Sequence, residues 1–140
     1  MRLWHKDLIP VLPRQQLLGQ WRELCLIAKN ISRKGTPGHV LVNQIMDYPL
    51  EHLVAYADLV ACEMRHRGYK VDFSKFDKYL SEISIEGYPS STEELFWAWH
   101  DDRYLKQCYY NLQEKADAGA IPLPEYWRVA FLIIKRGLYL

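Results

Sequence analysis

The sequence predicts a small all-α single domain over residues 1–140, built from three main helices, short helices and an aromatic C-terminal tail. Its length of 140 residues is typical of one domain. Hydrophobic residues make up 49% of the chain, and it has only 7 Gly and 7 Pro, which excludes disordered and collagen-like chains. Apolar residues also recur with the 3.6-residue period of a helix in three long segments.

The first main helix is predicted over residues 14–31. Its apolar stripe is formed by Leu17, Trp21, Leu24, Ala28 and Ile31. Pro13 stands just before it, where a helix tolerates proline best. The composition of residues 32–38, SRKGTPG, predicts that a loop follows.

The second main helix follows Pro49 and ends at Gly68. Its stripe is formed by Leu50, Leu53, Val54, Ala57, Val60, Ala61 and Met64. Arg65 and Arg67 fall in its last turn, where cations complement the helix dipole.

Shorter signals follow in the second half of the chain. A short helix is predicted over residues 74–83, and the capping box of Ser91 and Glu94 predicts another helix start. The third main helix is marked by Leu105, Cys108, Tyr109, Leu112 and Ala116, ends near Gly119, and either continues from Ser91 or restarts at Asp101. The tail over residues 125–140 is apolar and aromatic, and its pattern does not decide between helix and strand.

Several classes of protein are excluded or disfavoured by composition. No apolar run approaches the ~20 residues of a membrane span, and Arg2, Lys6 and Asp7 interrupt any signal peptide, so we expect a cytoplasmic protein without membrane contact. The three cysteines form no CxxC pair, and each lies beside apolar residues, so we expect buried thiols. No phosphate-binding glycine motif occurs, and no two histidines have helical metal-ligand spacing, so no cofactor and no metal is predicted.

The charge is unevenly distributed. The net charge is +1, but residues 1–70 contain ten Lys/Arg and six Asp/Glu, a balance of +4, and the remainder has eight and eleven, a balance of −3. The basic half is compatible with an anionic partner and equally with a solvated helix face.

The N-terminal segment is apolar enough to pack onto the body of the protein. It contains Leu3, Trp4, Leu8 and Ile9, so it places the α-amine of Met1 at a fixed position. An α-amine releases its proton at lower pH than a lysine side chain does, so more of it is neutral near pH 7. A neutral amine is a nucleophile that can form an imine.

The order of several short motifs resembles the pyrimidine-dimer DNA glycosylase/AP lyase family, of the phage endonuclease V type. The quoted motifs are Arg2, Gln15, Leu17, Trp21-Arg22-Glu23-Leu24, Gly38-His39-Val40, Cys62 with Arg67-Gly68-Tyr69, and Tyr126-Trp127-Arg128 with Tyr139. The resemblance covers residues 1–30 and 38–72 well and the last third loosely.

The resemblance implies a defined chemistry and a set of site residues. In this family an N-terminal amine attacks C1′ of a damaged nucleotide, the base leaves, an imine forms, and β-elimination cuts the strand. Carried over, Met1 supplies the amine and Glu23 is the acid/base and the stabiliser of the cationic sugar. The implied duplex DNA contacts are Arg2, Arg22, Gln16, His39, Lys115 and Trp127, in a monomer that extrudes a nucleotide.

Departures from the family pattern leave alternatives open. The family exposes a threonine amine after its methionine is removed, whereas position 2 here is Arg2, a residue before which methionine is normally retained. Either Met1 supplies the amine or the nucleophile is lost. Gln16 stands in place of a histidine, and Leu26 and Asn111 stand in place of arginines. The rivals are a non-catalytic nucleic-acid or protein binding module on the same fold, and an enzyme that uses the amine and Glu23 on another substrate.

Overall fold

Helical segments follow one another along the computed structural model, which describes residues 1–82, 89 and 91–138. In chain order they are the 3-10 helix η1 (Lys6–Val11), α1 (Arg14–Lys34), the 3-10 helix η2 (Asn43–Asp47), α2 (Glu51–His66), α3 (Ser74–Leu80), α4 (Asp102–Asp117) and α5 (Leu123–Lys135). The described residues contain no strand. The predicted all-α class is therefore confirmed.

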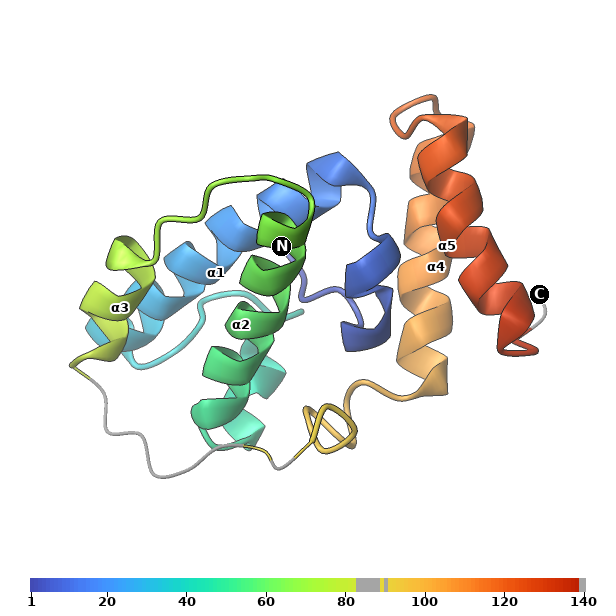
Figure 1. Ribbon diagram of the computed structural model, residues 1–140. Helices are drawn as coiled ribbons and strands as arrows, with labels where there is room; N and C mark the ends of the chain where they lie inside the picture. Colours follow the sequence, from blue (N-terminus) through green and yellow to red (C-terminus); the bar gives the residue numbers. More distant parts are fainter. Residues whose placement is uncertain (83–88, 90, 139–140) are drawn as a thin grey trace.

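The N-terminal segment lies at the centre of the molecule. Helix α1 packs against α2 and α3, α4 packs against α5, and η1 contacts both α2 and α5. Figure 1 shows η1, in dark blue, between these two groups of helices. Leu3, Leu8 and Leu12 are buried in the shared hydrophobic core, so the first residues are held by packing.

The helices α1 and α2 form where their apolar stripes predict. Helix α1 is longer than predicted, because residues 32–34 continue it instead of forming a loop. It ends at Gly35, whose φ of 72° is left-handed and whose N–H donates to the carbonyl of Ile31. Arg33 and Lys34 fall in its last turn, where cations are favourable.

The helix start predicted at Ser91 is wrong. Residues 91–99 form turns, Phe96 has a left-handed φ of 51°, and α4 begins at Asp102. Distant side chains take the backbone groups that a helix would use: Lys6 Nζ donates to the carbonyls of Glu93 and Leu95 at 2.9 and 2.7 Å. The Phe96 N–H also donates to His52 Nδ1 at 3.1 Å. These long-range hydrogen bonds outweigh the local capping signal.

The buried ammonium of Lys6 predicts a stability effect. We expect Lys6→Met to lower the free energy of unfolding by about 2–4 kcal/mol, because the buried carbonyl of Leu95 and the partly buried carbonyl of Glu93 lose their donor. Urea unfolding measures this change. The exposed Lys70 provides the control, since Lys70→Met should stay within about 0.5 kcal/mol of the wild type. Equal effects of the two substitutions would contradict this role for Lys6.

The C-terminal tail, left open by its sequence, is the helix α5. Its outer face also carries apolar side chains, at Leu123, Trp127, Phe131 and Ile134. The predicted helix end at Ile83 and the motif residue Tyr139 lie outside the described residues.

The cysteines differ in exposure. Cys108 is buried and Cys25 is partly buried, but Cys62 is exposed, so the expectation of three buried thiols is wrong. Cys62 is on the face of α2 opposite its apolar stripe. None of the helices in the described part of the chain is long and apolar enough to cross a membrane.

Candidate nucleic-acid processing site

The extended N-terminal segment meets α1 and α4 at a small cavity of about 220 Å³. Its lining consists of Met1, Arg2, Trp4, Glu23, Leu41, Asn111 and Lys115. Both residues predicted to be catalytic, Met1 and Glu23, therefore share one cavity. Lys115, predicted to contact DNA, joins them from α4.

Glu23 is placed at this cavity by α1. Its neighbours Trp21 and Leu24 are buried in the core, which turns the partly exposed Glu23 toward the N-terminal segment. Its Oε2 accepts a hydrogen bond from the backbone N–H of Arg2 at 3.4 Å. The N–H of residue 2, rather than the amine of residue 1, is thus the donor to the carboxylate. A carboxylate here can stabilise positive charge that develops on a bound sugar.

The side chain of Arg2 leaves the segment toward α4. Its guanidinium carbon lies 5.5 Å from the centroid of the Trp4 ring, and Nη1 lies 3.8 Å from Cys108 Sγ. Burial raises the pKa of the Cys108 thiol, so the sulfur stays neutral and is a poor nucleophile at pH 7. Of these two neighbouring side chains, Arg2 and Cys108, only Arg2 is therefore charged.

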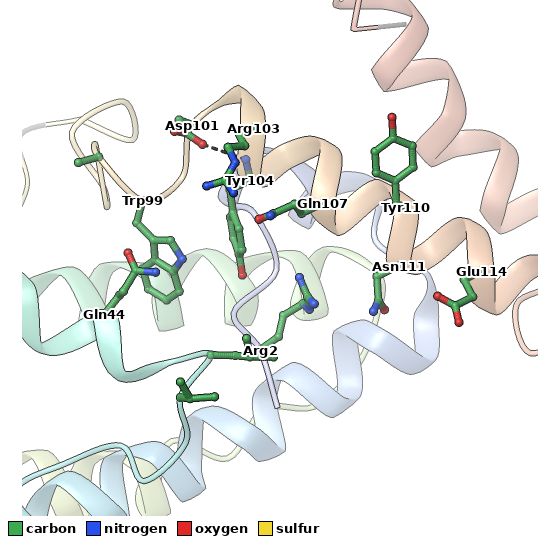
Figure 2. A pocket seen from close by; sticks show the side chains of 13 residues that line it. Arg2, Gln44, Trp99, Asp101, Arg103, Tyr104, Gln107, Tyr110, Asn111 and Glu114 are labelled. Carbon is green, nitrogen blue, oxygen red and sulfur yellow. Dashed lines mark hydrogen bonds between the residues drawn. The ribbon is translucent and has the colours of Figure 1, made fainter. Parts of the chain in front are cut away.

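A larger cavity of about 520 Å³ adjoins the first and shares Arg2, Leu41 and Asn111 with it. Figure 2 shows Arg2 extending toward the face of α4 that presents Tyr104, Gln107 and Asn111. Its other lining residues are Val40, Gln44, Ala98, Trp99, Asp101, Arg103, Tyr110 and Glu114. Aromatic rings mixed with amides and arginines can both stack on a flat polar ring and hydrogen-bond its edge.

Four residues predicted to contact DNA do not line either cavity. Arg22 is exposed on α1 beside Glu23, and Trp127 is 52% exposed on α5. Gln16 Oε1 is buried with no hydrogen-bond partner among the described residues. His39 is partly buried, and its Nδ1 accepts from the N–H of Leu41 at 3.2 Å, so it shapes the loop that brings Leu41 to both cavities.

Two further positions at which the chain departs from the family pattern, Asn111 and Leu26, differ in their relation to the cavities. Asn111 lines both cavities, whereas Leu26 is exposed on α1 one turn beyond Arg22.

In the described part of the chain, no group of three His, Cys, Asp or Glu side chains converges as a metal site would require.

Sequence reasoning missed two buried polar residues behind the cavity, Gln20 and Tyr56. Gln20 interrupts the buried face of α1 between Leu17 and Leu24, and its side chain is only 1% exposed. That interruption is a visible signal, because a polar residue within an apolar stripe needs a hydrogen-bond partner. The sequence could not identify that partner, which is the backbone of residues 2–4.

A comparison with known protein families identifies the family of this chain. The family model described as pyrimidine dimer DNA glycosylase matches residues 1–77. None of the curated proteins and none of the solved structures matches the chain. The matched region includes Met1, Arg2 and Glu23 of the small cavity and extends over more than half of the sequence. The chain therefore belongs to the pyrimidine dimer DNA glycosylase family, a family of DNA repair enzymes.

Proposed function

We propose that this protein is a DNA glycosylase/AP lyase that acts on pyrimidine dimers or abasic sites in duplex DNA through an imine on its N-terminal amine. One observation supports this most: Met1, Arg2 and Glu23 line the same cavity, inside the segment that matches the family. The proposal takes Met1 as the retained first residue. It also takes the enzyme to be a cytoplasmic monomer that needs neither cofactor nor metal.

The proposed reaction starts at C1′ of the damaged nucleotide. The neutral α-amine of Met1 forms a bond to C1′ while the base leaves with the electrons of the glycosidic bond. The nitrogen then loses a proton, and the C1′–O4′ bond breaks to give the iminium while O4′ takes up a proton and becomes a hydroxyl. Loss of a proton from C2′ expels the 3′-phosphate and cuts the strand. Glu23 stabilises the cationic sugar and relays these protons.

The duplex is proposed to lie across the small cavity. Arg22 on α1 and Lys115 on α4 flank Glu23 and supply phosphate contacts, and Arg2 positions the sugar. A nucleotide extruded from the duplex would have the larger cavity beside it, since the two cavities share Arg2 and Asn111.

The salt dependence of DNA binding by a Lys115 variant tests this placement of the duplex. We expect Lys115→Ala to reduce the slope of log K against log salt by about 0.9 for abasic-site duplex DNA, because one phosphate contact is lost. Lys78→Ala is the matched control, since α3 lies away from α4 (Figure 1), and its slope should stay that of the wild type. An unchanged slope for Lys115→Ala would remove this residue from the DNA interface.

The activity itself is tested by borohydride trapping on duplexes that contain an abasic site or a pyrimidine dimer. A covalent protein–DNA complex that disappears after reductive methylation of the N-terminus is the expected result. Absence of any complex at low salt, with the protein folded and the duplex bound, would instead identify a non-catalytic binding module.

A further inference from the structure

The backbone of residues 2–4 is held almost entirely by side chains. The segment has no regular secondary structure, and no strand pairs with it among the residues that the structure describes. The Arg2 N–H donates to Glu23, and the Leu3 carbonyl accepts from the Tyr104 hydroxyl at 2.5 Å. The remaining contacts, at Arg2 O and at both polar groups of Trp4, are made by Gln20 and Tyr56.

The side chain of Gln20 makes the hydrogen bonds that a neighbouring strand would make with this segment. Its Nε2 donates to the carbonyl of Arg2 at 2.9 Å, and its Oε1 accepts from the N–H of Trp4 at 2.8 Å. In a paired parallel strand, the N–H and the C=O of one residue would offer the same donor and acceptor. The primary amide provides the donor and the acceptor on two separate atoms of one side chain, whereas a carboxylate lacks the donor.

Tyr56 completes this arrangement from α2. Its hydroxyl lies 2.6 Å from the carbonyl of Trp4 and 2.9 Å from Gln20 Oε1, and the residue is fully buried. Burial raises the pKa of this phenol well above its usual value, so it remains a donor. Gln20 is thereby fixed in a single orientation.

Helix α1 fixes the positions of both groups in the proposed chemistry, the N-terminal segment and the Glu23 carboxylate. Gln20 and Glu23 are three residues apart on α1 and therefore share a face. Gln20 holds residue 2 through its carbonyl, while Glu23 accepts from the N–H of the same residue. The position of the first residue relative to the carboxylate is thus determined within one helical turn.

We propose that Gln20 and Tyr56 are positioning residues that hold the N-terminal amine beside Glu23. This inference rests on the proposed function, in which that amine is the nucleophile. Loss of the contacts should leave the DNA surface intact and displace the reacting nitrogen, so the chemical step is impaired more than binding.

The test compares Gln20→Met and the isosteric Gln20→Glu with Gln113→Met and Gln113→Glu, which alter a partly exposed glutamine of α4 that lines neither cavity. The first two measurements are hydrogen exchange of the Trp4 amide in the free protein and the single-turnover rate of borohydride trapping on abasic-site duplex DNA. Dissociation constants for the same duplex are measured without borohydride.

We expect both Gln20 variants to exchange the Trp4 amide at least tenfold faster than the wild type. Trapping should slow by roughly 10- to 100-fold, with the dissociation constant within threefold. The Gln113 variants should match the wild type in all three. Tyr56→Phe, which keeps the buried ring, should give the same pattern to a smaller degree and remains informative if the Gln20 variants do not fold.

Two results would overturn the inference. Unchanged exchange at Trp4 would show that Gln20 does not hold the segment, and faster exchange with normal trapping would show that it holds the segment without positioning the amine. A wild-type protein that does not trap overturns the proposed function instead. The two failures are distinguishable because the exchange measurement requires no DNA.

Discussion

Glu23→Gln is expected to lower the rate of borohydride trapping on abasic-site DNA by about 10²- to 10⁴-fold. The substitution keeps the size of the side chain and an oxygen that can accept from the Arg2 N–H. It removes the negative charge that would stabilise the cationic sugar and the group that would relay protons. Single-turnover trapping measures the rate, and the dissociation constant for the same duplex should change by less than about threefold.

A matched substitution separates this effect from a general loss of charge. Glu63 on α2 pairs with Arg67 at 3.0 Å and does not line either cavity of the candidate site. Glu63→Gln should therefore trap within twofold of the wild type. A Glu23→Gln protein that traps as fast as the wild type would exclude Glu23 from the chemistry.

Acidification below pH 6.5 is expected to destabilise the protein by about 2 kcal/mol per pH unit. The cause is a pair of stacked, buried histidines, His5 and His100, whose ring centroids are 5.1 Å apart. His5 Nδ1 accepts from the N–H of Asp7, and His100 Nδ1 accepts from the N–H of Lys6. A proton on either nitrogen would replace an existing hydrogen bond.

The direction of this effect follows from the two pKa values. Burial lowers the pKa of His5 and, more strongly, that of His100, where the neighbouring His5 and Lys6 add to the effect. At His5, Asp7 opposes the shift, while Lys6 and Arg136 support it. A lowered folded-state pKa means that the stabilisation is complete above the unfolded value near 6.5 and is lost as pH falls toward the folded value. Each histidine contributes at most about 1.4 kcal/mol per pH unit.

Urea unfolding between pH 7.5 and 5.5 measures this dependence. The His100→Gln variant offers an amide oxygen to the Lys6 N–H and cannot be protonated in this range. Its free energy of unfolding should fall less steeply with pH than that of the wild type. Identical slopes for the two proteins would show that His100 is not a source of the acid sensitivity.

Local signals predicted the fold wherever they agreed with tertiary contacts. The stripes of α1 and α2 face the core as expected, and the start of α4 is fixed by the side chain of Asp101, which accepts from the N–H of Tyr104. The capping box at Ser91 does not start a helix, because the side chain of Lys6 binds the carbonyls of Glu93 and Leu95 that a helix would use. These two acceptors are 87 and 89 residues away from Lys6 in the sequence. No local pattern encodes such a contact.

The candidate site could be predicted only in part, for a related reason. Met1 and Glu23 were identified through their motif context, and the structure places them at one cavity. Gln20 and Tyr56 were missed because their partners are backbone atoms of an extended segment far away in the sequence. The roles assigned to all the site residues remain predictions, and Arg22, Gln16, His39 and Trp127 do not line the cavities.

The location of the covalent bond tests the central claim most directly. After borohydride trapping on abasic-site duplex DNA, nuclease treatment and cleavage before Asp7 yield the peptide of residues 1–6, which fragment-ion mass spectrometry can sequence. Our account predicts that the reduced sugar is attached to the α-amine of Met1. Attachment to the side chain of Lys6, to Lys115 or to any other lysine would contradict it.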